Sequence, residues 1–228
     1  MNQINNLDQL RLIIFDFDGT LANTQSLILR TMRMSLEEMA LEVPSEERCA
    51  SVIGLPLSEI IEALYQNPDR QLAQTFSDTY RRLFAENNVP GAVTEFPGVK
   101  PTLETLKSRG LQLSVATSRT HQSLDMLTKD LGIHHLFSYM LGCDDVQLAK
   151  PHPEPVLRTL EALNVTAAET LVVGDAIYDI QMGQRAGCRT CGVTYGNGTP
   201  EAIRSVSPTF IIDAFPQLLS LPPLSVPQ

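Results

Sequence analysis

The chain has 228 residues, of which 43% are hydrophobic and 19% are charged. This length and composition predict a globular protein with a core of its own, and they exclude a disordered chain. The formal net charge is −9, and no run of lysine or arginine offers a track for a phosphate backbone. Nucleic acid is therefore excluded as an expected partner.

The N-terminal residues 1–10 are polar and lack the basic-then-apolar order of a secretory signal. No apolar run in the sequence approaches the length of a membrane span. We therefore expect a cytoplasmic protein with no membrane partner. The four cysteines include one C-x-x-C pair, Cys188 and Cys191, without a second pair or a nearby histidine, so we interpret all four as reduced structural residues.

The first predicted element is a buried strand over residues 10–15, which is almost entirely apolar and ends at Asp16. Residues 22–95 then follow a helical pattern, with apolar side chains spaced three and four residues apart and no convincing strand. Beyond residue 96, helices and strands alternate. The predicted strands are 111–116, 137–141, 170–173 and 189–193, and the predicted helices are 99–109, 121–131, 154–163 and 177–186.

Strands that alternate with helices of this size predict an α/β fold with a parallel, Rossmann-like sheet covered on both faces. We expect residues 1–21 and 96–228 to form this core. Residues 22–95 would form a helical cap, inserted after the first strand and lying over the strand ends.

Ligands of open parallel sheets bind at the carboxyl ends of the strands, so polar residues directly after the strands are the first candidates for a site. Asp16 and Asp18 follow the first strand and lie two residues apart. Two carboxylates this close repel each other unless a cation or a shared proton offsets them, which suits a divalent metal and paired nucleophile and acid–base roles.

Three further strand ends carry candidates. Thr117 and Ser118 follow the strand 111–116, where hydroxyl and backbone N–H groups can bind a phosphate oxygen. Lys150 is one of only four lysines and stands before a proline-rich turn, and Asp175 and Asp179 follow the strand 170–173. Each of these residues taken alone could simply cap a helix or form a turn. Polar residues at four strand ends of one sheet, however, predict a functional site. Oxygen ligands without histidine or thiolate favour magnesium over zinc.

The sequence D-F-D-G-T, then Thr117, then Lys150, then G-D-A-I-Y-D resembles the four ordered motifs of the haloacid dehalogenase-like hydrolase superfamily. The K-P-H-P segment and V-T-Y-G-N-G-T-P-E at 193–201 resemble its phosphoglycolate phosphatase branch. The resemblance implies a phosphatase that acts on a small phosphorylated metabolite.

The same resemblance implies the role of each residue. The carboxylate of Asp16 attacks phosphorus to give a phosphoaspartate, and Asp18 acts first as acid and then as base. Magnesium is held by the carboxylates of Asp16 and Asp175 and by the backbone carbonyl of Asp18, with Asp179 in support. Lys150, Thr117 and Ser118 bind the phosphate. In the cap, we expect the 52–57 loop, with Gly54 and Leu55, and the nearby cation Arg48 to contact the rest of the substrate.

Several alternatives share these core motifs. Asp18 argues against a haloalkanoic acid dehalogenase, and the absence of lysine from residues 22–95 argues against phosphonoacetaldehyde hydrolysis through a Schiff base. Pyrophosphate and nucleoside monophosphates stay open as substrates. A mutase of the β-phosphoglucomutase type and a non-enzymatic binding module are less favoured. The oligomeric state is not predicted.

Overall fold

The structure, a computed structural model, describes residues 10–89 and 91–222. Its centre is a six-stranded sheet in the order β5-β4-β1-β6-β7-β8, in which every pairing is parallel. The strands are β1 (Leu12–Phe15), β4 (Gln112–Ala116), β5 (Tyr139–Leu141), β6 (Thr170–Gly174), β7 (Arg189–Val193) and β8 (Phe210–Ile212). The predicted α/β fold with a Rossmann-like parallel sheet is confirmed.

Helices cover both faces of the sheet, and the alternating side chains of β1 show how. Ile13 and Phe15 belong to the larger apolar cluster, together with residues of α5, α6 and the segment Phe215–Ser220. Leu12 and Ile14 point to the other face and pack with residues of α7 and α8. The helices are α5 (Val99–Ser108), α6 (His121–Asp130), α7 (Glu154–Leu163), α8 (Ile177–Arg185) and α9 (Pro200–Ser205). A strand buried on both faces explains the continuous apolar run seen in the sequence.

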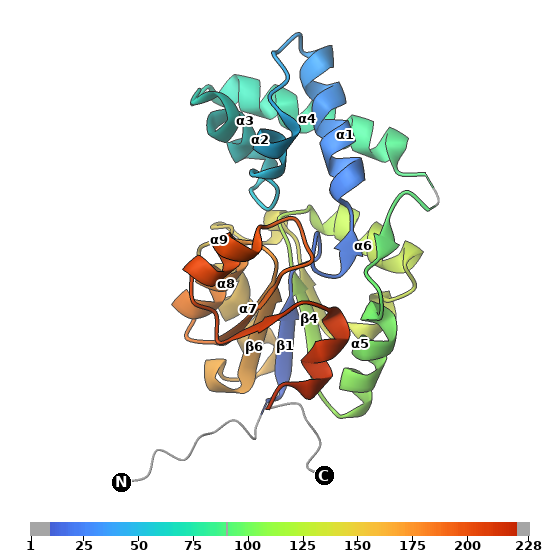
Figure 1. Cartoon of the computed structure of the whole chain (residues 1–228), viewed down its shortest axis with the longest axis vertical. Coiled ribbons are helices and arrows are strands. Elements are labelled where there is room, and N and C mark those ends of the chain that lie inside the picture. Colours follow the sequence, from blue (N-terminus) through green and yellow to red (C-terminus); the bar gives the residue numbers. More distant parts are fainter. Residues whose placement is uncertain (1–9, 90, 223–228) are drawn as a thin grey trace.

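Four further helices form a separate layer above the carboxyl ends of the strands (Figure 1). They are α1 (Gln25–Glu38), α2 (Glu46–Ala50), α3 (Leu57–Tyr65) and α4 (Arg70–Asn87). Met32 and Leu36 of α1 and Phe76 of α4 are fully buried, because apolar residues at helical spacing face one another in this layer. We call this helical layer the cap and the sheet with its helices the core. The exact boundaries at residues 21/22 and 95/96 stay a prediction.

The structure departs from the predicted elements in two places. Short strands β2 (Ala22–Asn23) and β3 (Thr94–Glu95) pair where the chain enters and leaves the cap, although no strand was expected within residues 22–95. The strand β8 and the helix α9 were also missed. All four elements are short, with two to six residues each, so they carry too few residues to show a periodic pattern.

Within residues 10–89 and 91–222, no helix is long and apolar enough to cross a membrane. Residues 1–9, which supported the expectation that a secretory signal is missing, lie outside the described part of the chain. Cys188 and Cys191 are buried, and burial raises the pKa of each thiol to about 12.

Candidate active site

Three carboxylates and one ammonium group meet at the carboxyl ends of β1 and β6. Asp16 follows β1, and Asp175 and Asp179 lie directly after β6 and in the first turn of α8. One carboxylate oxygen of each of these residues lies within 4.8 Å of the others, and all three residues are buried. Lys150 Nζ donates to Asp16 Oδ1 and, at 2.7 Å, to Asp179 Oδ1. Parallel strands that end at one edge bring these residues together although they are far apart in the chain.

The position of Asp175 is determined by its hydrogen bonds and by a glycine. Its Oδ1 accepts from the Thr20 hydroxyl at 3.0 Å, and its Oδ2 accepts from the backbone N–H of Asn197 at 2.7 Å. Gly19 has a φ of +82°, and a Cβ atom there would lie 2.1 Å from Asp175 Oδ2. Glycine at this turn therefore satisfies both the left-handed backbone and the close approach of the carboxylate. The buried Nδ2 of Asn197 has no hydrogen-bond partner among the described residues.

The electrostatics of this cluster favour a bound cation. Burial, and then the charge of Asp179, raise the pKa of Asp175 to about 7. Burial and the charge of Asp179 also raise the pKa of Asp16 well above its ordinary value, against the opposing effect of Lys150. Burial lowers the pKa of Lys150, but the charges of Asp16 and Asp179 outweigh it, so the net shift is upward. When all three carboxylates are ionised, they and the ammonium of Lys150 carry a net charge of −2. Hard oxygen donors with that charge fit a divalent cation of the magnesium type.

Asp18 lies beside this cluster but is paired with a different cation. Arg119 Nε donates to Asp18 Oδ2 at 2.7 Å and Arg119 Nη2 donates to Oδ1 at 2.6 Å, so the guanidinium binds both oxygens. The Thr24 hydroxyl donates to Oδ1 at 2.6 Å. The guanidinium also lies 4.5 Å from the ring centroid of Phe84 in the cap. The carboxylate of Asp18 is thus oriented from both core and cap.

The remaining candidates of the core lie at the end of β4. Thr117 is buried and lines the cavity described below, and its Oγ1 accepts from the backbone N–H of Arg119 at 3.3 Å. Ser118 lines the same cavity, but its hydroxyl donates across the cleft to the backbone carbonyl of Gly54 at 2.7 Å. This hydroxyl is therefore used to join cap and core.

The cap candidates divide into two groups. Gly54 and Leu55 line the cavity next to the core residues, as expected of the 52–57 loop. Arg48 does not line it. Its guanidinium donates to the backbone carbonyl of Ala63 and its side chain is solvent-exposed, so the structure does not bring Arg48 to the site.

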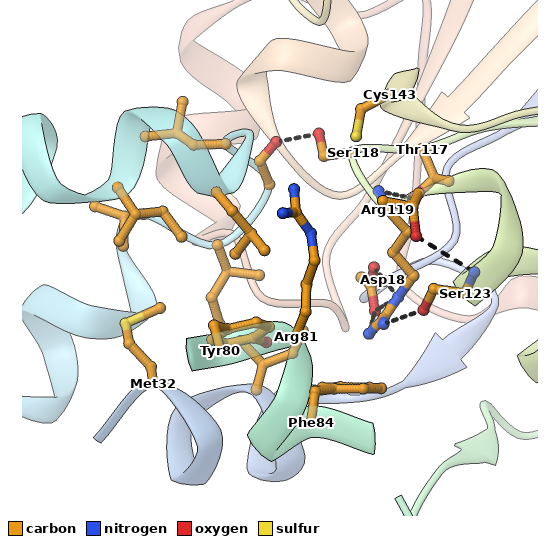
Figure 2. A pocket seen from close by; sticks show the side chains of 18 of the residues that line it. Asp18, Met32, Tyr80, Arg81, Phe84, Thr117, Ser118, Arg119, Ser123 and Cys143 are labelled. Atoms are coloured by element: carbon orange, nitrogen blue, oxygen red, sulfur yellow. Dashed lines mark hydrogen bonds and ion pairs between the residues drawn. The ribbon is translucent and has the colours of Figure 1, made fainter. Parts of the chain in front are cut away.

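A cavity of about 300 Å³ lies between the cap and the core, with Asp16 and Asp18 among its lining residues. Figure 2 shows Met32 and Tyr80 on the cap side and Asp18 and Arg119 on the core side, with Arg81 between them. A concave site that contains titratable groups with raised pKa values at the ends of parallel strands is a strong candidate for an active site.

Sequence reasoning missed Arg119, Thr20 and Asn197. Arg119 follows Thr117 by two residues in the same strand-end turn, so the need of Asp18 for a cationic partner could have pointed to it. Thr20 closes the D-F-D-G-T segment, where a hydroxyl beside two carboxylates is a usable signal. Asn197 lies 22 residues after the aspartate whose oxygen it binds, and no local pattern links the two.

The chain is similar to proteins of known family over most of its length. The family model of haloacid dehalogenase-like hydrolases matches residues 13–193. A pyrophosphatase named PpaX from Anoxybacillus flavithermus is 33% identical over 209 residues, which cover 92% of this chain and 95% of that protein. A phosphoglycolate phosphatase from Pectobacterium atrosepticum is 33% identical over 219 residues, 94% of this chain and 93% of that one.

Solved structures agree with these relatives. A crystal structure from Bacteroides fragilis, described as a haloacid dehalogenase-like hydrolase, superposes with a TM-score of 0.87 at 26% identity and covers 92% of this chain and 100% of that one. The family match, the identity above 30% over nearly the whole chain and the shared fold lead to one conclusion. The chain belongs to the haloacid dehalogenase-like hydrolase family.

Proposed function

We propose that the protein is a magnesium-dependent phosphatase that hydrolyses a small phosphorylated metabolite through a phosphoaspartate on Asp16. The observation that carries this proposal is the buried cluster of Asp16, Asp175, Asp179 and Lys150, with Asp18 two residues beyond the nucleophile. The names of the relatives support a phosphatase, since they include a phosphoglycolate phosphatase and a pyrophosphatase.

In this proposal the chain's residues divide the reaction between them. An oxygen of Asp16 attacks phosphorus and the bond from phosphorus to the leaving oxygen breaks, while Asp18 gives that oxygen its proton. Asp18 then takes a proton from the water that attacks the phosphoaspartate, which restores Asp16 and releases inorganic phosphate. Lys150 and Thr117 bind the oxygens of the transferred group.

The carboxylates of Asp16 and Asp175 and the backbone carbonyl of Asp18 would hold magnesium, with Asp179 in support. When bound, the ion offsets the negative charge of the nucleophile and the phosphate. Asp179 also accepts from Lys150 and, at 3.0 Å, from the backbone N–H of Ala176. Both of its oxygens are used, so we assign it the supporting role of orienting Lys150 beside the ion.

Pyrophosphate hydrolysis is the second candidate, favoured by the relative named as a pyrophosphatase. It would use the same core residues, since only the leaving group differs. The nucleoside-monophosphate, mutase and binding-module alternatives have no observation of their own here.

The test is phosphate release, with magnesium, from phosphoglycolate, pyrophosphate, sugar phosphates and nucleoside monophosphates. The control is Asp16→Asn, which keeps the size of the side chain but removes the nucleophile. Release that requires magnesium and is lost in the variant supports the proposal. Turnover retained by a folded Asp16→Asn protein would contradict the phosphoaspartate.

A further inference from the structure

The cavity between cap and core is mainly polar on its core side and mainly apolar on its cap side. Its core side carries the carboxylates of Asp16 and Asp18 and the hydroxyl of Thr117. Its cap side is formed by α1, the 52–57 loop, α3 and α4. The residues there are mainly apolar, with Arg81 of α4 as the charged exception: Met32, Ile53, Leu57, Ile60, Tyr80 and Phe84. A substrate whose phosphate lies beside Asp16 would therefore place its leaving group against these apolar cap residues, which we call the apolar wall.

The cap contacts the core in this structure, and the apolar wall faces the cavity that lies between them. The Ser118 hydroxyl donates to the Gly54 carbonyl at 2.7 Å, and a Cβ atom on Gly54 would lie 3.4 Å from Ala176 Cβ. The 52–57 loop thus already lies against the core at two strand ends. Leu55 and Leu57 nevertheless stay only half-buried, and both line the cavity of about 300 Å³. The space they border is of the size found for small-molecule sites.

The cations near this wall are already paired. Arg119 binds both oxygens of Asp18, and only 10% of its side chain is exposed. Arg81 lines the cavity from α4 and pairs with Asp78 through one nitrogen at 3.2 Å, and its side chain is 47% exposed. No lysine belongs to the lining among the residues that the structure describes. An anionic leaving group would lose its hydration against the apolar side chains of the cap, and Arg81, the cation of the described lining that does not bind Asp18, is already shared with Asp78.

We propose, building on the phosphatase function proposed above, that the leaving group is uncharged and mainly apolar. The substrate class is then a phosphate monoester of an alkyl or aryl alcohol of about the size of a single ring. The phosphate supplies the charge that Lys150 and the metal recognise, and the alcohol is recognised by burial of its apolar surface. Glycolate and inorganic phosphate, which are charged leaving groups, fit this cavity less well.

The test compares a homologous series with charged substrates. We would measure kcat/KM with magnesium for ethyl, propyl, butyl and pentyl phosphate and for benzyl phosphate, against phosphoglycolate and pyrophosphate. The four alkyl substrates leave as alcohols of nearly equal acidity, so a trend among them reports contact with the wall. We expect an increase of about fourfold per methylene. We also expect benzyl phosphate to exceed phosphoglycolate by at least tenfold.

Variants of lining residues then show which side chains cause the increase of kcat/KM along the alkyl series. Leu57→Gln should flatten the increase along the alkyl series, whereas Leu72→Gln, also a half-buried leucine of the cap but outside the lining, should leave it unchanged. Met126→Gln is a second variant that does not risk the fold, because Met126 lines the cavity from α6 and is 41% exposed. It should reduce the increase as well.

The outcomes separate this inference from the function on which it depends. If every substrate of this panel is left intact, the phosphatase proposal itself fails, and this inference fails with it. If hydrolysis occurs but the alkyl series is flat, and phosphoglycolate or pyrophosphate is preferred, the phosphatase stands and the apolar leaving group is wrong. A preference of that kind that disappears in Arg81→Gln would show instead that Arg81 binds a charged leaving group.

Discussion

Asp175→Asn is expected to stabilise the metal-free protein and to remove its response to magnesium. Burial and the charge of Asp179 raise the pKa of Asp175 from the ordinary 3.8 to about 7. A shift of that size corresponds to about 4 kcal/mol at pH 8, since one pKa unit is worth about 1.36 kcal/mol. The amide keeps one oxygen acceptor, so it loses one of the two hydrogen bonds from Thr20 and Asn197, worth about 1 kcal/mol. The expected net gain is about 3 kcal/mol.

The sign of the pH dependence follows from which state holds the proton. Between pH 3.8 and about 7 the folded protein keeps a proton on Asp175 that the unfolded chain has lost. The associated stability is fully present below the unfolded pKa and is lost as the pH rises through the folded value. The advantage of Asp175→Asn should therefore be large at pH 8 and small at pH 4.5.

Thermal unfolding in chelator measures this difference. A gain of about 3 kcal/mol raises Tm by roughly 6 to 12 °C in a chain of this length. Added magnesium should raise Tm of the wild-type protein, by an amount that corresponds to about 2.7 kcal/mol at 100 times Kd, and should leave Asp175→Asn nearly unchanged. Asp130→Asn, at an exposed position of α6, is the control for the loss of one negative charge.

Two results would refute the reasoning. If Asp175→Asn in chelator is less stable than the wild-type protein at pH 8, the three carboxylates do not repel one another as the structure indicates. If magnesium raises Tm equally in both proteins, the ion binds somewhere else.

Three further predictions concern the residues around this cluster. Asp18→Asn should slow turnover by about 10² to 10⁴, the range of lost acid–base catalysis, and a near-normal kcat would remove its role. Arg119→Lys should lower kcat by about tenfold with a smaller change in KM, because a lysine cannot bind both oxygens of Asp18. Steady-state kinetics at saturating magnesium measure both constants, and an unchanged kcat would contradict this prediction. Gly19→Ala should abolish the rise in Tm with magnesium, since its Cβ would displace Asp175, whereas Gly110→Ala, with a φ of +85° and no neighbour within 4 Å of the added atom, should retain the rise.

The sequence predicts those parts of the protein that follow a regular pattern along the chain. Apolar runs that alternate with amphipathic helices predict the parallel sheet. The rule that ligands bind at the carboxyl ends of strands indicates Asp16, Thr117, Lys150 and Asp175 as site residues. The strand β8 could not be found in the same way, because its three residues are too short for a pattern and it is ordered mainly by pairing with β7. The cytoplasmic location stays a prediction.

The partners of the site residues were harder to predict than the residues themselves. The sequence shows that Arg48 is a cation near a loop of the cap, but not that its guanidinium donates to the backbone carbonyl of Ala63. The rule for strand ends does not single out Arg119, although it follows Thr117 by only two residues. Which way a long side chain points depends on packing against other elements, in this case against Phe84 of the cap, and no local pattern contains that information.

The two aspartates of the D-x-D segment show how one turn can separate two chemical tasks. Asp16 is buried between Asp175, Asp179 and Lys150, and the ammonium of Lys150 offsets part of its charge. Asp18, two residues later, lies beside that cluster and is paired with Arg119. Environments this different suit the proposed division of roles, in which one carboxylate is the nucleophile and a metal ligand and the other exchanges protons with the leaving group. Because Arg119 also contacts the cap through Phe84, the position of the cap and the orientation of Asp18 are physically linked.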